Sequence, residues 1–307
     1  MKLNGALLGK TDQNNLNDGY LGPTQTNYIS QYAQYFVKYI KAFAAQGVTV
    51  NAITLQNEPL WSSSTYPTMY MYDYEQGQLI QYHIGPALAK AGLSTSIWAY
   101  DHNTDVPSYP QNVLNIARQY TSAVSWHCYA GNLDWSFMSD FRNKNPGVTQ
   151  YMSECWTPPV GASNWFQAAN FTIGLLQNWA AGVMAWGLAT DASHGPHLPG
   201  GCTQCRGLVT INKDGTYTFN IAYYLMAQFS RFMPRSAVVL KGTGSSKNQN
   251  AAGIQSVATM NPDKTRTVVI MNTFTNDVYV TLNVTSGQPW SGNVLASSIV
   301  TWVLPAT

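Results

Sequence analysis

The sequence predicts an α/β protein with two parts: a parallel sheet with its covering helices, then an antiparallel β-sandwich-like module. Up to Pro234, short apolar runs of strand length alternate with longer segments of helical periodicity, an order typical of βα units with right-handed crossovers. After Pro234, only short alternating segments follow, separated by Gly, Asn, Asp and Pro. We therefore divide the chain into residues 1–234 and residues 235–307.

The individual elements follow from local periodicity. Residues 27–46 predict a helix, because Tyr28, Tyr32 and further apolar residues recur at threes and fours and Gly47 stands at the C-cap position. The other predicted helices are 74–91, 107–120, 134–144, 164–179 and 221–232. The predicted parallel strands are 50–55, 94–100, 123–129, 148–155 and 182–190, and those of the C-terminal module are 237–241, 253–260, 265–272, 277–284 and 299–304. Residues 1–26 and 66–71 are predicted loops, the second of them aromatic.

Composition limits the kinds of partner. The chain has 307 residues, 45% of them hydrophobic, which is enough for a large core. Only 10% are charged and the formal net charge is +2, which argues against nucleic acid or an anionic membrane surface as partner, because both need clustered Lys and Arg. No apolar run approaches the length of a membrane span. Many of the 10 Trp and 19 Tyr belong to the core, but such rings also suit an uncharged sugar ligand.

Two glutamates stand at the ends of predicted parallel strands. Glu58 follows an apolar run that ends at Leu55, and the next residue, Pro59, cannot extend a ladder and favours extended backbone before it. Glu154 ends the run of residues 148–155 in the same way. The C-terminal ends of parallel strands are where α/β barrels keep their chemistry. A single glutamate is more often a solvated loop carboxylate, but this pair predicts acid/base and nucleophilic catalysis on a glycosidic bond.

Four motifs together resemble glycoside hydrolase family 30, whose members are retaining (β/α)8 barrels of clan A with an appended β module. They are Leu55-Gln56-Asn57-Glu58-Pro59, Trp126-His127-Cys128-Tyr129, Ser153-Glu154-Cys155 and Trp186 in the fifth predicted strand. The resemblance covers essentially the whole chain, and residues 196–211 resemble the fungal branch that contains endo-β-1,6-glucanases. It implies a partial TIM barrel, since about five of the eight βα units can be found. We interpret the chain as truncated at its N-terminus relative to the family.

The resemblance implies roles for individual residues. Glu58 matches the general acid/base and Glu154 the nucleophile of a double displacement that needs no cofactor and no metal. Such a mechanism requires one protonated and one ionised carboxyl group about 5–5.5 Å apart.

The same resemblance implies substrate contacts. Asn57 matches the residue that hydrogen-bonds the sugar 2-hydroxyl, Tyr129 a phenol directed at the nucleophile, and Trp186 the aromatic floor under the sugar. His127 and Asp101 are further candidates for contacts to substrate hydroxyls.

The best match is therefore a retaining hydrolase of β-linked glucan, an endo-β-1,6-glucanase. Endo-β-1,6-galactanase and glucosylceramidase stay open, because residues outside the motifs separate these activities. A carbohydrate-binding remnant without activity is an alternative of another class, favoured by the missing strands and opposed by the two glutamates. We expect an extracellular protein, given the low charge and the N-glycosylation sequons at Asn170 and Asn283. On this interpretation its signal peptide was lost with the missing N-terminus. We also expect the protein to be a monomer.

The four cysteines fall into two pairs. Cys202 and Cys205, with two histidines nearby, could hold zinc, but a Gly/Pro-rich loop in a secreted chain favours a small disulfide. Cys128 and Cys155 end neighbouring predicted strands, where they either bridge or stay buried thiols.

Overall fold

The structure, a computed structural model, describes residues 29–61, 68–131, 133–157, 164–241, 253–284 and 287–306. The predicted loop of residues 1–26, the start of the first predicted helix and part of the aromatic loop at 66–71 lie outside these residues. The chain divides into two compact units. Unit 1 is Met1–Ala130, Lys144–Ser153 and Leu198–Gly201, and unit 2 is Gly131–Asn143, Glu154–His197 and Cys202–Thr307.

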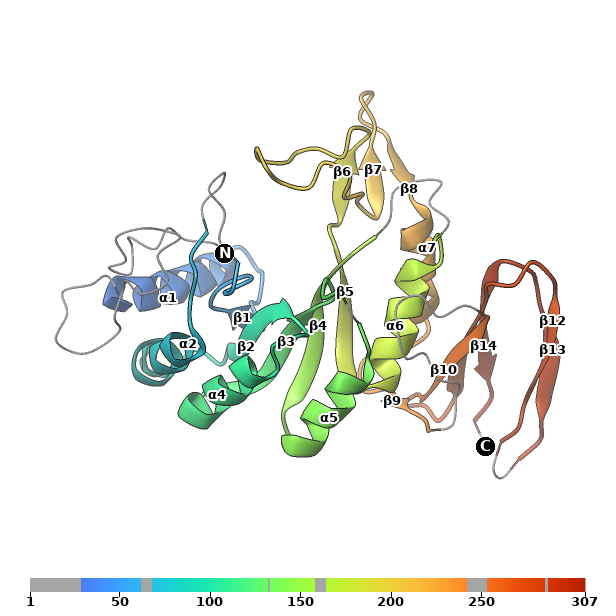
Figure 1. Cartoon of the computed structure of the whole chain (residues 1–307), viewed down its shortest axis with the longest axis horizontal. Helices are drawn as coiled ribbons and strands as arrows, with labels where there is room; N and C mark the ends of the chain where they lie inside the picture. Colours follow the sequence, from blue (N-terminus) through green and yellow to red (C-terminus); the bar gives the residue numbers. More distant parts are fainter. Residues whose placement is uncertain are drawn as a thin grey trace. The chain divides into compact units, whose positions relative to one another are not determined.

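The five predicted parallel strands form one sheet in chain order (Figure 1). They are β1 (Ala52–Thr54), β2 (Ser96–Asn103), β3 (Thr121–His127), β4 (Thr149–Trp156) and β5 (Ala180–Trp186). Parallel pairing sets Ala52 opposite Ser96 in β1 and β2, and Tyr100 opposite Ser125 in β2 and β3. The expected α/β architecture with a parallel sheet is confirmed.

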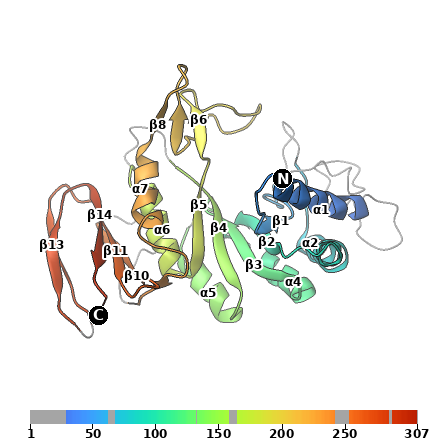
Figure 2. The ribbon, with the colours of Figure 1, turned by 180° about the vertical axis from the view of Figure 1, so that it is seen from behind.

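Helices precede, connect and follow the strands of this sheet, as predicted. They are α1 (Ile29–Ala45), α2 (Asp73–Leu79), α3 (Gly85–Lys90), α4 (Ser108–Ala117), α5 (Ser136–Lys144), α6 (Gln167–Gln177) and α7 (Ile221–Ser230). Of the predicted apolar stripe of α1, Tyr32, Phe36 and Ile40 are buried, whereas Tyr35 and Phe43 are exposed. The Tyr32 hydroxyl donates to the Leu55 carbonyl just after β1. In unit 2, α6 and α7 lie side by side (Figure 2). Within the described ranges, no helix combines the length and the apolar character that a bilayer span needs.

A π-helical segment, Ile80–Ile84, interrupts the helix that we predicted over residues 74–91. Pro86 has no amide N–H, so the α-helical bond to the carbonyl four residues earlier cannot form. The chain widens instead, and the Gly85 N–H donates to the Ile80 carbonyl five residues earlier. Hydrophobic periodicity could not show this change of helix type, because the buried face continues through it.

We expect Gly85→Ala to lower the free energy of unfolding by about 1–3 kcal/mol, an overpacking cost. A Cβ at this position would lie 2.3 Å from Cγ of the Tyr120 ring, so the ring would have to move. Gly131→Ala is the matched control, since no heavy atom lies within 4 Å of a Cβ there. Thermal unfolding measures both, and equal melting temperatures would contradict the tight contact at Gly85.

Two antiparallel sheets form the C-terminal part of unit 2. One has the order β14 (Ser298–Leu304), β11 (Arg266–Asn272), β10 (Ile254–Met260) and β9 (Val238–Val239), and the other is the hairpin of β12 (Val278–Leu282) and β13 (Trp290–Val294). Their core includes Ala258, Val268, Ile270, Val294 and Leu304. The predicted antiparallel module is thus present. We did not predict β13, because its sequence WSGNV has the composition of a loop.

The predicted strand over residues 182–190 was wrong at its end. β5 stops at Trp186, and a separate small sheet follows, built from β6 (Ala189–Asp191), β7 (Val209–Ile211) and β8 (Tyr217–Phe219). The chain changes partner just after β5, where the N–H groups of Leu208 and Val209 donate to the carbonyl groups of Gly187 and Leu188 at 3.1 and 3.0 Å. Strands of three residues are too short for their periodicity to be recognised in sequence.

The predicted disulfide between Cys202 and Cys205 is confirmed, with an S–S distance of 2.03 Å. Its two sulfur atoms are bonded to each other and are therefore not available as thiolate ligands for zinc. Cys128 and Cys155 are also disulfide-bonded, which decides the alternative left open by the sequence.

Candidate active site

Glu58 sits in a tight turn just after β1. Its backbone has φ 50°, in the left-handed region, so the extended conformation that we predicted from Pro59 was wrong. Two hydrogen bonds override the local preference, because the Glu58 N–H donates to the Asp101 carbonyl and the Glu58 carbonyl accepts from the Trp61 N–H, both at 2.9 Å. Pro59 occupies the second position of this turn, which its fixed φ suits.

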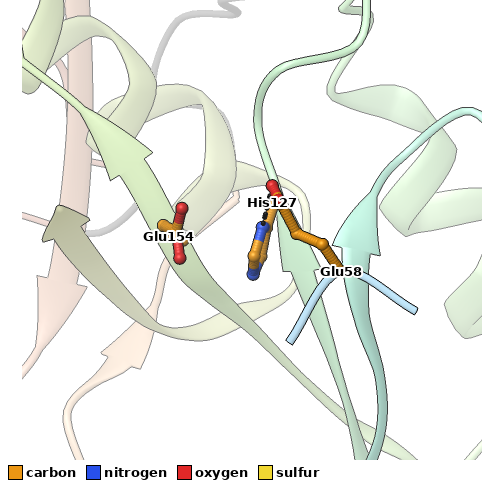
Figure 3. A group of neighbouring side chains, drawn as sticks. All are labelled: Glu58, His127 and Glu154. Carbon is orange, nitrogen blue, oxygen red and sulfur yellow. Dashed lines mark hydrogen bonds and ion pairs between the residues drawn. The ribbon is translucent and has the colours of Figure 1, made fainter. Parts of the chain in front are cut away.

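The Glu58 carboxylate is paired with His127, the last residue of β3. His127 Nδ1 lies 3.3 Å from Glu58 Oε1 (Figure 3). The imidazole is 1% exposed and the carboxylate 18% exposed, so only Glu58 reaches solvent to any extent. A buried ring behind a partly exposed carboxylate can hold that carboxylate in one orientation.

Asp101, in β2, holds the other side of the His127 ring. His127 Nε2 lies 3.2 Å from Asp101 Oδ1. The Ser153 hydroxyl donates to Oδ1 at 2.6 Å, and the Thr54 hydroxyl donates to Oδ2 at 2.7 Å. Three neighbours thus occupy both carboxylate oxygens of Asp101.

The charge of Asp101 fixes how His127 is oriented. Burial alone would raise the pKa of Asp101, but the hydrogen bond and charge of His127, with the hydroxyls of Ser153 and Thr54, lower it to about 2. Asp101 is therefore ionised and can only accept hydrogen bonds, so Nε2 of His127 carries a proton and Nδ1 faces Glu58. The geometry favours a role for His127 and Asp101 in positioning Glu58, and their predicted contact with substrate hydroxyls stays a prediction.

Glu154 follows Ser153 directly in β4. Because the Ser153 hydroxyl is bonded to Asp101 at 2.6 Å, the strand is anchored one residue before Glu154. Figure 3 shows Glu154, His127 and Glu58 as neighbouring side chains. One carboxylate oxygen of each glutamate and one ring nitrogen of His127 lie within 4.8 Å of one another. These two glutamates are thus neighbours although they lie 96 positions apart in the sequence.

The same three side chains are donor types that a divalent metal ion uses. His127 Nδ1, however, already faces Glu58 Oε1 as its partner. The predicted glycosidic chemistry needs no metal, and the absence of a metal from the mechanism stays a prediction.

The other predicted site residues lie at or just beyond strand ends. Asn57 precedes Glu58 in the bend after β1 and is half-buried. The N–H of Tyr129 donates to Asn103 Oδ1 at 3.1 Å, and its ring stands edge-on to His127 at a centroid distance of 6.0 Å. Trp186 is the last residue of β5 and is 39% exposed. Their contacts with a sugar stay predictions.

Our sequence reasoning missed Thr54 and Ser153, the two hydroxyl donors to Asp101. Both are ordinary residues in strand sequences, and only the neighbourhood of Ser153 and Glu154 in one motif could have drawn attention to one of them. Their role depends on contacts 47 and 52 residues away in sequence.

Comparisons with known proteins agree with this architecture. A family model described as "Glycosyl hydrolase family 30 TIM-barrel domain" matches residues 5–233, and one described as "Glycosyl hydrolase family 30 beta sandwich domain" matches residues 241–302. Among solved structures, "The endo-beta1,6-glucanase BT3312" is similar with a TM-score of 0.82 and 29% identity, over 95% of this chain and 68% of that chain.

Fungal proteins are similar along the whole chain. Endo-1,6-beta-D-glucanase neg1 of Aspergillus fumigatus is 66% identical over 100% of this chain and 63% of its own length. Endo-1,6-beta-D-glucanase BGN16.3 of Trichoderma harzianum is 62% identical over 100% of this chain and 62% of its own length. The chain thus spans less than two thirds of these relatives. Since the barrel model alone matches well over half of the sequence, the chain belongs to glycosyl hydrolase family 30.

Proposed function

We propose that the protein is a retaining endo-β-1,6-glucanase, with Glu58 as general acid/base and Glu154 as nucleophile. The observation that carries the proposal is the 66% identity, over the whole chain, to a protein named as an endo-1,6-β-D-glucanase. Relatives named as glucosylceramidases are only 24–26% identical, which makes that activity the weaker alternative.

The spacing of the carboxylates supports a retaining mechanism. Retaining glycosidases hold their two carboxyl groups about 5–5.5 Å apart, whereas inverting enzymes need about 6.5–9.5 Å to admit a water molecule. One oxygen of Glu58 and one oxygen of Glu154 lie within 4.8 Å of each other, a distance between single atoms that is compatible with the shorter spacing. A nucleophile can then attack the sugar directly.

The first step would cleave the glycosidic bond. A carboxylate oxygen of Glu154 attacks the anomeric carbon while Glu58 gives its proton to the departing glycosidic oxygen. The leaving glucan departs as an alcohol, and the other part of the chain remains as an ester on Glu154. The His127 ring, held by ionised Asp101, keeps the Glu58 carboxyl group directed at that oxygen.

The second step would release the sugar. Glu58, now ionised, takes a proton from water as the water oxygen attacks the anomeric carbon and the bond to Glu154 breaks. Two inversions give net retention, and both glutamates return to their starting protonation states.

The products of β-1,6-glucan hydrolysis test this proposal. We expect a rapid fall in viscosity, a ladder of β-1,6-linked oligosaccharides, and a β-anomeric reducing end as the first product seen by NMR. Parallel assays use β-1,6-galactan and glucosylceramide. An α-anomer formed first would contradict the retaining mechanism, and preference for galactan or glucosylceramide would contradict the substrate.

The alternative that this chain is an inactive carbohydrate-binding remnant is tested by including a second protein in the same assay. This chain is compared with a version extended by the part of the Aspergillus fumigatus relative that it does not cover. Activity of the extended version alone would assign the function to the longer protein. Silence of both on β-1,6-glucan would reject the proposed activity.

We also propose that the protein is an extracellular monomer. All four cysteines are disulfide-bonded, as is typical of oxidising compartments. Of the two sequons, Asn283 is exposed, whereas Asn170 is 0% exposed within α6 and offers no acceptor in the folded chain. Recovery from the medium of a secreting host, and sedimentation of the purified protein, test the two statements.

A further inference from the structure

An array of aromatic side chains lies in the segment that follows Glu58. We define the aromatic shelf as Trp61, Tyr70, Tyr72 and Tyr74, all in unit 1 with Glu58. Trp61 is 51% exposed and Tyr74 is 45% exposed, while Tyr70 and Tyr72 are half-buried. Large rings with this exposure contribute little to the core, so their position calls for another explanation.

The shelf is fixed to Glu58 through the backbone. Trp61 closes the turn that begins at Glu58, with its N–H 2.9 Å from the Glu58 carbonyl oxygen. The Met71 N–H donates to the Pro59 carbonyl at 2.8 Å, which brings the segment around Met71 back beside the same turn. Trp61 and the segment around Met71 are therefore both tied to residues within one position of the proposed acid/base.

Alternation along the chain sets the direction of Tyr70 and Tyr72. Met69 and Met71 are 0% and 1% exposed, so the tyrosines between and after them point to the opposite, outer side. The buried Tyr109 hydroxyl lies 3.0 and 3.2 Å from the carbonyl oxygens of Met71 and Tyr72 and holds this segment in place.

The three tyrosine rings form a continuous series. Tyr70 and Tyr72 meet edge to face with centroids 5.4 Å apart, and Tyr72 and Tyr74 are near parallel, 15° between planes and 5.5 Å between centroids. Neighbouring carboxylates are already engaged, because Glu75 accepts from the Tyr72 N–H and Asp73 accepts from the Tyr74 N–H and from Asn112. The shelf thus offers aromatic faces and hydroxyls instead of free charge.

We propose that the aromatic shelf binds the glucose units on the leaving side of the scissile bond. This inference rests on the proposed function. Glu58 would protonate the glycosidic oxygen, which departs with the leaving chain, so the leaving glucose units lie on the Glu58 side of the site. Aromatic rings take the apolar C–H faces of pyranose rings, and phenol hydroxyls can bond to sugar hydroxyls.

A flexible substrate gives such a shelf a physical purpose. A β-1,6 linkage contains an additional rotatable bond compared with linkages to ring hydroxyls, so a bound chain loses more conformational freedom. Rigid rings that are already held in place reduce the further entropy loss on binding. The shelf would fix the leaving units and thereby the position of the glycosidic oxygen near Glu58.

Binding of β-1,6-linked glucohexaose to the Glu154→Gln protein tests the proposal, since that background should not consume the ligand. We expect Trp61→Ala and Tyr72→Ala each to weaken binding about tenfold. Tyr72→Phe should bind within about threefold of the parent, because the ring face remains. Tyr82→Ala is the matched control, as Tyr82 is 66% exposed on the π-helical segment and outside the shelf.

A kinetic comparison in protein that retains Glu154 distinguishes an effect on the leaving side from an effect on the rest of the site. Shelf variants should lower kcat/KM about tenfold on β-1,6-glucan and change kcat/KM on β-glucosyl fluoride, whose leaving group is a single atom, by no more than about twofold. The inference would be overturned if the shelf variants bound the hexaose as tightly as Tyr82→Ala does, or if their kcat/KM fell equally on both substrates. Either result would leave the glucanase proposal intact. A parent protein that neither binds nor cleaves β-1,6-glucan would reject the proposed function and the shelf with it.

Discussion

Replacement of Glu154 by Gln is expected to lower kcat on β-1,6-glucan by about 10⁴-fold or more, because no group remains to form the glycosyl ester. The loss should be the same on an aryl glucoside with a good leaving group. A nucleophile is needed whatever the leaving group is. Initial rates of reducing-sugar and phenol release measure the two substrates.

Glu58→Gln should behave differently on the two substrates. Its kcat on β-1,6-glucan should be about 10²–10⁴-fold lower than that of the parent, because the leaving oxygen needs a proton there. Formation of the glycosyl-enzyme from the activated aryl glucoside should be nearly unaffected, since a good leaving group departs without one. External azide should then restore turnover by replacing the activated water.

Asp140→Asn is the control for both substitutions, because Asp140 is an exposed carboxylate on α5. It should retain the parent activity. Equal losses for Glu58→Gln on glucan and on the activated substrate would contradict the acid/base role, and a Glu154→Gln protein with a tenth of the parent activity would contradict the nucleophile.

Asp101→Asn is expected to lower kcat on β-1,6-glucan on the order of 10²-fold with little change in KM. The neutral amide can donate as well as accept, so His127 Nε2 need not carry a proton. The ring can then adopt another tautomer or an orientation in which it no longer pairs with Glu58. Because Asp101 acts through Glu58, kcat on the activated aryl glucoside should fall much less. A purely structural defect would lower kcat equally on both substrates, and that result would contradict the positioning role.

The same substitution should change how stability depends on pH. The folded-state pKa of Asp101 is lowered from 3.8 to about 2, so its ionised form stabilises the fold above about pH 4. That contribution is lost as the pH falls from about 4 toward 2. Melting temperatures measured across this range should fall less steeply in Asp101→Asn than in the parent, with Asp140→Asn following the parent.

Sequence reasoning predicted those parts of the site that depend on local pattern. Glu58 and Glu154 could be placed because each follows a short apolar run, and strand ends in a parallel sheet meet at one edge. The resemblance to the family added His127 and Asp101 as candidates, but with a substrate-binding role. Their connection to each other could not be predicted, since it depends on side-chain contacts across three strands, from β2 to β4.

The elements that were missed have a common physical origin. β6, β7 and β8 have three residues each, and β13 contains Gly and Asn, so none of them carries a periodic signal. The π-helical segment preserves the buried face of a helix while changing its hydrogen bonds. The short strands and β13 are decided by tertiary pairing, which outweighs local propensity, whereas the change of helix type follows from the missing N–H of Pro86.

The left-handed backbone at Glu58 also affects how this site could be lost. Tyr100 and Asp101 share it, with φ 79° and 73°, and for residues with a Cβ that conformation costs about 1–2 kcal/mol each. Glycine at these positions would relieve the backbone and, at Glu58 and Asp101, remove the chemistry. Selection for folding alone would therefore not preserve a glutamate in this turn, so a lineage that stopped using its substrate should tend to lose Glu58.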